Sequence, residues 1–454
     1  MAKTMDMTVG NPARLILTFC LPIAAGNLLQ QFYNLVDTLV IGRGVGVVAL
    51  AAVSGAGWLD WTVLSIAMGL AQGFAIQIAQ SFGAGNHREL QRAVGQSILL
   101  AVATIFLLEI ASQAALMPVL RLLAFPENTI HLTALYLRII FGGLPLIMGF
   151  NLLSGFLQSV GDSRTPLIAL VVATVVNILL DVTCVIVLRW DVAGAAIATT
   201  ASQAVSFLIC LRAVIHLPLL HPTAQDMRPD HHMIHRLLSL GIPVAFQNLI
   251  ISIGGLVLQR VVNGFGFIFM AGYNAASRLQ GMLELCGTAI GAGVGTFAGQ
   301  NLGAGKLERV REGLRKSAVI TVCVSLCITL CMFLFGRQLL ALFVDDDPQI
   351  VDQVLTYGHR LLLVLSSALW GLYLLFVHRS TLQGLGDTFI PMLSGVVELV
   401  MRITCALLLP RLIGEWGVYF AEIAAWLGAA ALLIWGYHHR MHILERAQTP
   451  PSAS

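Results

Sequence analysis

Twelve apolar segments, each long enough to cross a lipid bilayer, dominate the sequence and limit what the chain can fold into. A transmembrane helix needs about 20 apolar residues. Of the 454 residues, 57% are hydrophobic and only 11% are charged, whereas soluble domains usually carry about 25% charged residues. The composition therefore excludes a soluble enzyme and predicts an all-α, polytopic membrane protein. The expected spans are 14–42, 47–81, 90–122, 128–156, 166–188, 192–215, 235–263, 267–299, 307–335, 349–382, 390–411 and 416–438.

An even number of spans places both termini on one side of the membrane, and the distribution of Lys and Arg indicates which side. Sixteen basic residues fall in the termini and in the loops on the same side, six lie at the opposite ends of the spans, and four lie within spans. Because cytoplasmic loops are enriched in Lys and Arg, both termini are predicted to be cytoplasmic. The first span is long and carries polar residues, so we expect it to be retained rather than cleaved as a signal peptide.

The sequence also repeats itself. Three motifs of the first half recur in the same order in the second half, at offsets of 221, 220 and 225 residues. The matched motifs are Leu21-Pro22-Ile23 with Ile242-Pro243-Val244, Gly83-Ala84-Gly85 with Gly303-Ala304-Gly305, and Gly161-Asp162 with Gly386-Asp387. Six spans per half make both halves start on the same side, which predicts a parallel repeat of the kind used by transporters.

The repeat predicts two lobes of six helices, at 1–215 and 234–454, joined by a cytoplasmic linker at 216–233. The formal net charge of +3 is small and dispersed, so nucleic acid is not expected as a partner. The eight cysteines lie in apolar segments without a zinc-type spacing, and no metal centre is expected from them.

The motifs resemble those of the multidrug and toxic compound extrusion (MATE) family, and the resemblance covers essentially the whole chain. The matching residues are Leu21-Pro22-Ile23, Asn34-Leu35-Val36-Asp37, Ile41-Gly42-Arg43, Gly83-Ala84-Gly85, Gly161-Asp162, Pro166, Asn177, Asp181, Gly194-Ala195-Ala196 and Gly386-Asp387-Thr388. The resemblance implies two pseudo-symmetric lobes in a V-shaped arrangement. It also implies a monomeric secondary transporter of a bacterial cytoplasmic membrane, surrounded by lipid and needing no cofactor besides a coupling ion. Such proteins are cation-coupled antiporters that export amphiphilic drugs and dyes.

The first span carries a polar stripe that is unusual for a membrane helix. Asn27, Gln30, Gln31, Asn34 and Asp37 fall within roughly 120° of arc at 100° per residue. Polar side chains in a bilayer either bond neighbouring helices together or face a cavity. Five on one stripe favour the cavity, so the four amide residues are predicted to line the substrate site.

Four residues on different spans share one depth. Asp37, Tyr136, Asp181 and Thr199 each lie roughly 9–12 Å below the outer surface, at a rise of 1.5 Å per residue. Asn177 lies one turn from Asp181 on the same face. Equal depth does not establish contact, because the rotation of each helix about its axis is unknown from the sequence.

The family resemblance supplies an assignment for this group. In the DNA-damage-inducible branch, the positions matching Asp37, Asn177, Asp181 and Thr199 form the cation or proton site of the N-lobe, and the position matching Tyr136 joins its hydrogen-bond network. The sodium-coupled branch instead uses acids of the C-lobe, at positions where this chain has Ile251 and a neutral residue near Leu372. Within the repeat, Leu258 is the counterpart of Asp37, so coupling is expected in the N-lobe alone.

The residue types suit a proton more than a metal ion. Two carboxylates that share a poorly hydrated site cannot both ionise cheaply, so the pair favours holding one proton. The same oxygens can hold Na⁺, and the sequence leaves the choice open. Pro22 removes a backbone hydrogen bond and is a candidate hinge, with a static kink as the alternative.

The remaining charges within spans have no assigned role from the sequence. Glu398 and Arg402 are four residues apart and are predicted to pair with each other. The others are Glu109, Arg138, Arg278, Glu284 and Glu422. With only four basic residues in spans, a flippase for lipid-linked pyrophosphates is the weaker alternative function, because such a cavity should be strongly cationic. An intramembrane enzyme is weaker still, since the sequence shows no nucleophile or metal constellation.

Overall fold

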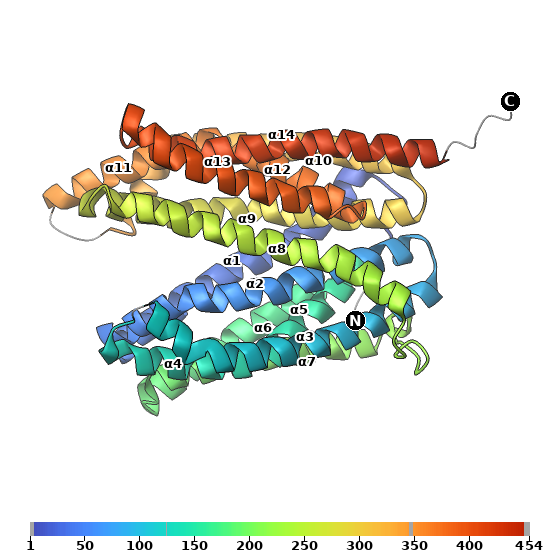
Figure 1. The fold of residues 1–454 in the computed structure, drawn as a ribbon, viewed down its shortest axis with the longest axis horizontal. Coiled ribbons are helices and arrows are strands. Elements are labelled where there is room, and N and C mark those ends of the chain that lie inside the picture. Colours follow the sequence, from blue (N-terminus) through green and yellow to red (C-terminus); the bar gives the residue numbers. More distant parts are fainter. Residues whose placement is uncertain (1–3, 124, 345–347, 449–454) are drawn as a thin grey trace. The chain divides into compact units, whose positions relative to one another are not determined.

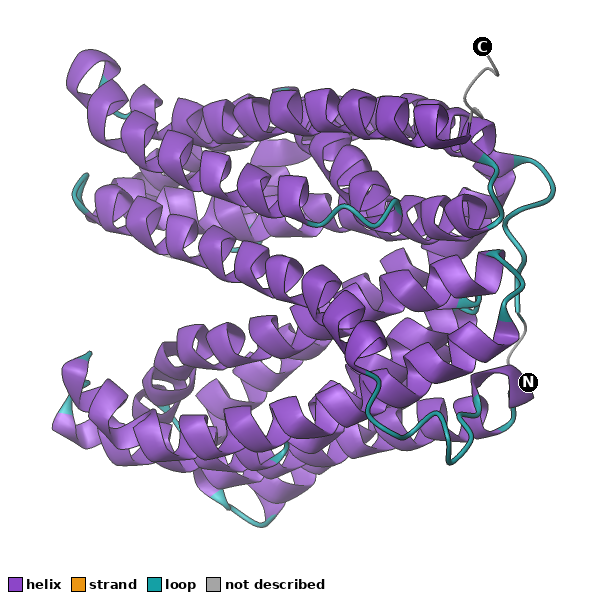
Figure 2. Cartoon of the chain, turned by 45° about the vertical axis from the view of Figure 1, so that its right-hand side comes forward, coloured by secondary structure: helices purple, strands orange, loops and turns teal. Residues whose placement is uncertain are grey.

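The computed structural model describes residues 4–123, 125–344 and 348–448. Helices account for almost all of this part of the chain, and it contains no strand (Figures 1 and 2). The helices are α1 (Pro12–Gly44), α2 (Val47–Gly83), α3 (His87–Leu122), α4 (Glu127–Gly142), α5 (Leu144–Ser159), α6 (Arg164–Asp181), the π-helix η1 (Val182–Val187), α7 (Asp191–Ile215), the 3₁₀-helix η2 (Pro218–Leu220), α8 (His231–Asn263), α9 (Phe267–Gly303), α10 (Leu307–Ala341), α11 (Pro348–Ser367), α12 (Leu369–Gly384), α13 (Phe389–Ile413) and α14 (Trp416–Gln448). The all-α membrane architecture expected from the sequence is confirmed.

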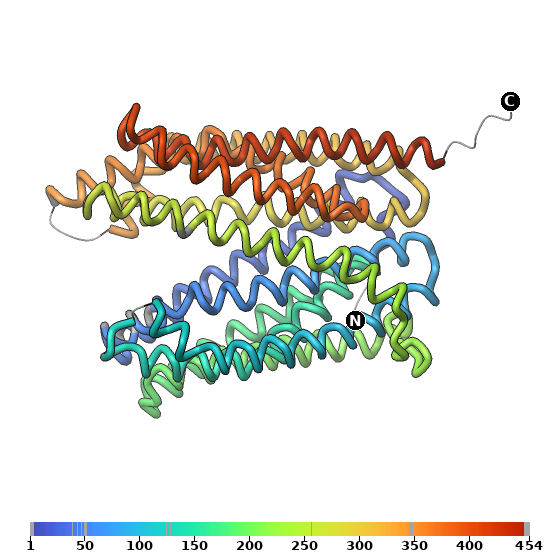
Figure 3. Tube along the Cα trace, viewed as in Figure 1, coloured from blue at the N-terminus to red at the C-terminus, as the bar shows by residue number. Residues whose placement is uncertain are grey.

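Ten of these helices are individually long and apolar enough to cross a membrane. Two further spans are bent pairs: α4 with α5, at 46°, and α11 with α12, at 49°. Counting each pair as one span gives twelve, in agreement with the twelve predicted segments. The tube in Figure 3 follows these segments in order along the sequence.

The two bends lie at equivalent places in the repeat. Gly143 interrupts the first pair and Ala368 the second, and these positions are 225 residues apart. Pro145 follows the first break and has no N–H for the preceding turn. At the second break, the Ser366 and Ser367 hydroxyl groups donate to carbonyl oxygens of the preceding turn, an arrangement that bends helices.

Turns between helices repeat in the same way. Gly85 and Gly305, at an offset of 220, have φ angles of 66° and 71°. Gly161 and Gly386, at an offset of 225, have φ angles of 90° and 75°. Because these values favour residues without a Cβ, the matched glycines support the internal repeat found in the sequence.

The chain divides into two compact units whose boundaries fall inside two helices. Unit 1 contains residues 1–6 and 21–245, and unit 2 contains residues 7–20 and 246–454. The first turns of α1 therefore belong to unit 2, and the first turns of α8 belong to unit 1. Pro22 and Pro243, which correspond in the repeat, each lie within three residues of a boundary.

Unit 1 has two clusters of buried apolar side chains. One gathers α2, α3, α5 and α7 around Phe74 and Phe156, which are fully or almost fully buried. The other gathers α2, α3, α4 and α7 around Leu137 and includes Tyr136. The predicted cation-site residue of α4 is therefore held by a packed core.

Unit 2 packs α9 against α10, α11 and α12, and packs α14 against α12 and α13. Tyr373 and Tyr419 are its largest fully buried side chains. The segment before α1 is bound within this unit, because the Met7 backbone N–H donates to Gln300 Oε1 at 2.8 Å. Met7 itself is fully buried.

Candidate functional site

The five residues predicted for the cation site lie on α1, α4, α6 and α7 of unit 1. Asp37 is seven residues before the end of α1, and Thr199 is eight residues after the start of α7. Asn177 and Asp181 lie in the last turns of α6 and are completely buried. Tyr136 is buried in α4.

The structure brings the two aspartates together. The carboxyl groups of Asp37 and Asp181 lie within hydrogen-bonding range of one another, and the Asn177 side chain lies beside Asp181. Their charges act on the nearby Tyr136 hydroxyl group. Sequence depth alone had not established any of these contacts.

The two carboxyl groups have no donor to satisfy them. Asp37 Oδ1 and both carboxyl oxygens of Asp181 are buried, and no described residue donates a hydrogen bond to them. None of the ion pairs in the described chain involves either residue. Buried oxygens of this kind are costly unless they are neutralised. The pair is therefore chemically suited to hold a proton or a small cation.

Asp181 ends the regular part of its helix. The next six residues form the π-helix η1, in which the Leu188 N–H donates to the Thr183 oxygen at 2.8 Å. An approach of α7 accompanies this change, because a Cβ at Gly194 would lie 3.1 Å from the Cys184 carbonyl carbon. Single-turn π segments are rare and frequently occur at functional sites. The sequence gave no sign of this one.

Two polar residues of the site were missed by the sequence analysis. The Tyr33 hydroxyl group donates to Thr199 Oγ1 at 3.0 Å and so joins α1 to α7. Tyr33 lies one turn before Asp37, and that spacing is the signal that could have identified it. The second missed residue is Asp60 of α2, whose charge acts on Tyr33 and Tyr136 together with those of Asp37 and Asp181. An acid inside an apolar span is a signal in its own right.

The residues predicted to line the substrate cavity lie on an accessible part of α1. Gln30 and Asn34 are exposed, whereas Asn27 and Gln31 are half-buried. The predicted hinge residue, Pro22, lies two residues beyond the point where α1 passes from unit 2 to unit 1.

Unit 2 contains a buried network of opposite charges. Glu398 pairs with Arg402 at 3.8 Å, which confirms the predicted pair. Glu398 also pairs with Arg379 of α12, and Arg402 pairs with Glu422 of α14 at 3.0 Å. Arg379 had been counted as a loop residue in the sequence, but it lies inside α12 and is only 7% exposed.

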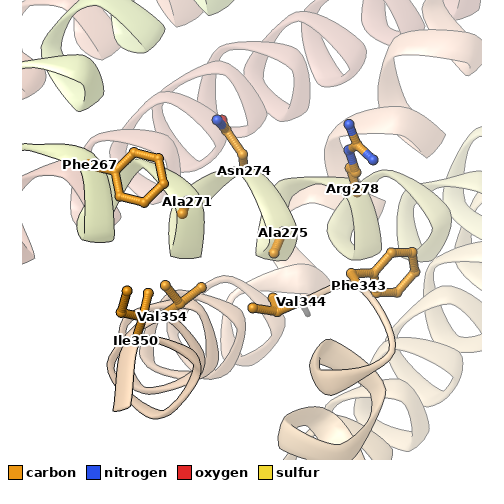
Figure 4. Close-up of a pocket in the computed structure, with 9 residues that line it drawn as sticks. All are labelled: Phe267, Ala271, Asn274, Ala275, Arg278, Phe343, Val344, Ile350 and Val354. Atoms are coloured by element: carbon orange, nitrogen blue, oxygen red, sulfur yellow. The ribbon is translucent and has the colours of Figure 1, made fainter. Parts of the chain in front are cut away.

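Two cavities of about 270 Å³ lie away from the aspartate pair. The one in unit 2 lies against α9 and α11 (Figure 4). Its Asn274 and Arg278 side chains point away from Val354, so the wall formed by α11 is apolar. The cavity in unit 1 lies between α3 and α4 and includes Arg138. Neither contains a residue predicted for coupling or for substrate binding.

Comparisons with known proteins agree with this architecture. The MatE family model matches residues 22–183 and 243–408. A probable multidrug resistance protein of Bacillus subtilis, YoeA, is 28% identical over 440 residues, covering 92% of each chain. A second, YpnP, is 34% identical over 352 residues, covering 76% of this chain and 77% of its own. A FAD transporter of Shewanella oneidensis is 26% identical over 85% of this chain and 84% of its own.

Solved structures show the same fold. A MATE crystal structure in complex with MaL6 superimposes with a TM-score of 0.92 at 22% identity, covering 98% of this chain and 100% of that one. An outward-facing MATE transporter of the MOP superfamily gives a TM-score of 0.90 at 22% identity, with the same coverage.

Proposed function

Because the chain belongs to the MatE family of multidrug and toxic compound extrusion transporters, we propose that it exports amphiphilic organic cations in exchange for protons. The family consists of secondary transporters, so the chain is a transporter and not an enzyme. The relatives named as multidrug resistance and multidrug export proteins support the drug substrates. The proposed location is a bacterial cytoplasmic membrane with both termini in the cytoplasm, on the distribution of Lys and Arg.

The aspartate pair of unit 1 is the observation that carries the proposal. Two carboxyl groups face each other without a basic partner, and between them they can hold one positive charge at low cost. A proton and a cationic drug can therefore compete for the same negative charge. Competition of this kind couples the two transport directions, since each cation leaves the site when the other one enters.

The direct contact of Asp37 and Asp181 supports a proton over Na⁺. A proton fits between two oxygens at hydrogen-bonding range, whereas a metal ion would have to separate them and recruit further oxygens. The Tyr33–Thr199 hydrogen bond already uses one of the nearby hydroxyl donors. Asn177 and Thr199 remain the further oxygen ligands that Na⁺ would need.

The position of Pro22 supports a bending role for α1. Proline removes one backbone hydrogen bond from the helix, and the break occurs where α1 passes between the two units. We propose that proton binding at Asp37 changes the bend at Pro22 and so helps to open the site to one side of the membrane at a time.

Ethidium transport in proteoliposomes, with pH and Na⁺ gradients imposed separately, tests the proposal. We expect a proton gradient alone to drive concentrative ethidium transport and a Na⁺ gradient alone to drive none. Transport driven only by Na⁺ would overturn the proton coupling and keep the exporter. Absence of ethidium transport together with translocation of a lipid-linked pyrophosphate would instead favour the flippase, although no basic side chain adjoins the unit 1 site to receive such a headgroup.

A further inference from the structure

Asp60 is a membrane-embedded acid to which the coupling mechanism assigns no task. It lies thirteen residues after the start of α2, a helix whose 37 residues are mostly apolar. The helix brings it about 20 Å inward along the axis from Val47. A carboxyl group at such a depth is unfavourable unless it serves a partner or a ligand.

No partner for Asp60 exists among the described residues. Its Oδ1 atom is buried and receives no hydrogen bond, and the carboxyl group joins no ion pair in that part of the chain. An unpaired acid in a membrane protein usually faces a polar enclosure. The surroundings of Asp60 identify that enclosure.

Asp60 borders the same enclosure as the aspartate pair. Its charge acts on the Tyr33 and Tyr136 hydroxyl groups, and the charges of Asp37 and Asp181 act on the same two groups. The neighbouring α4 is tied to α2 by the Thr133 hydroxyl group, which donates to the Ala52 oxygen at 3.2 Å. Three acids from three helices therefore surround two tyrosine hydroxyl groups.

Asp60 nevertheless stands apart from the coupled pair. Asp37 and Asp181 act on one another, and Asp60 is not among the groups that act on either of them. Asp37 lies seven residues from the end of α1 and Asp60 thirteen residues from the start of α2, and a two-residue turn joins these ends. The two acids therefore differ in depth by about 9 Å along the helices.

The arrangement gives unit 1 two separate negative centres. The aspartate pair can hold one positive charge, and Asp60 can hold a second one deeper in the membrane. No basic side chain is among the groups that act on Asp37, Asp60 or Asp181. A substrate with two positive charges could therefore be neutralised at both centres.

We propose that Asp60 is a substrate-binding residue that holds the second positive charge of dicationic compounds, and so extends the exporter's range from monocations to dications. This inference rests on the proposed export function and names a substrate class for it. It assigns the aspartate pair to coupling and Asp60 to specificity.

Ethidium and propidium form a matched pair of probes for this assignment. Both carry the same flat phenanthridinium ring, and propidium adds a second quaternary ammonium group on a short alkyl arm. Asp60→Asn keeps the shape of the side chain and removes its charge. We expect Asp60→Asn to export ethidium within about twofold of the wild type while propidium export falls at least about tenfold. Asp60→Glu should restore most of the propidium export.

Glu109→Gln is the matched control, because Glu109 is another acid within a span of unit 1 but does not act on either tyrosine. It should leave the ratio of the two rates unchanged. Equal loss of both dyes in Asp60→Asn, or unchanged propidium export, would overturn the assignment. So would a wild-type protein that takes ethidium and rejects propidium.

Equilibrium binding of the two dyes to the purified protein separates this inference from the proposed function. If the wild type exports neither dye under any gradient, the proposed function fails. The binding ratio still decides the role of Asp60: selective loss of propidium affinity in Asp60→Asn supports it, and unchanged relative affinity refutes it.

Discussion

Replacing Asp37 by Asn should uncouple the transporter while leaving drug binding in place. The substitution keeps the size and hydrogen-bonding capacity of the side chain and removes one of the two facing charges. With both groups ionised at roughly 4 Å, their repulsion at an effective dielectric constant of 20 is about 4 kcal/mol. That energy favours a proton at the pair by roughly a thousandfold, and Asp37→Asn removes it.

Proton-driven export should therefore fall at least about a hundredfold in Asp37→Asn, since two thirds of that energy already corresponds to this factor. Ethidium affinity should change little, because Asp181 keeps its charge. The measurements are the initial rate of ethidium accumulation in proteoliposomes under an imposed pH gradient and equilibrium binding to the purified protein. Passive, downhill ethidium movement serves as the control for intact insertion.

The double variant sharpens the test. If Asp37 and Asp181 act as one unit, Asp37→Asn with Asp181→Asn should be little worse in coupled export than either single variant. Additive losses would mean that the two carboxyl groups act separately. Gradient-driven export by well-inserted Asp37→Asn at half the wild-type rate would refute the shared-proton mechanism altogether.

Three further substitutions test other parts of the structure. Pro22→Ala restores a backbone N–H in α1, so export should slow severalfold while ethidium affinity is kept; an unchanged rate would exclude a hinge at this position. Glu398→Gln strands two buried arginines and should cost about 3–5 kcal/mol of stability, read as a large fall in the melting temperature in detergent; a shift within error would contradict a structural network. The Thr223 hydroxyl and backbone N–H hold the pKa of Asp226, in the connection between α7 and α8, below its usual range. The stabilisation it gives is thus present above the ordinary carboxyl pKa and lost as pH falls through its lowered value, so hydrogen exchange around residue 226 should accelerate under acid in the wild type and already at neutral pH in Asp226→Asn; equal exchange in both would refute it.

The spans and the repeat were predictable because apolar length and motif offsets are written in the sequence. The bends at Gly143 and Ala368 were not, since the apolar pattern runs through both positions without interruption. Arg379 was misplaced for a related reason: a basic residue near the end of an apolar segment resembles a loop residue until its partner, Glu398, is brought beside it.

The cation site was predictable in its residue types but not in its contacts. Depth and family resemblance selected Asp37, Asp181 and Thr199. The contact between the aspartates depends on the rotation of α1 and α6 about their axes, which a sequence does not encode directly. Asp60 was overlooked because it stands alone on its helix, without the polar stripe that marks α1.

The internal repeat explains why coupling belongs to one unit although both share a fold. Adding the offset of 221 to Asp37 gives Leu258, which is buried in α8. Adding 225 to Asn177 and Asp181 gives Arg402 and Ala406 of α13.

Unit 2 thus places a guanidinium group where unit 1 places a neutral amide, and it has no acid at either position of the pair. Asp60, at an offset of 220, corresponds to Gln280, whose buried amide carries no charge. A positive group would meet Arg402 at the unit 2 counterpart of the site, already paired with Glu398 and Glu422. The same helical scaffold therefore holds a structural charge network in one unit, while the unpaired acids that can exchange cations lie in the other.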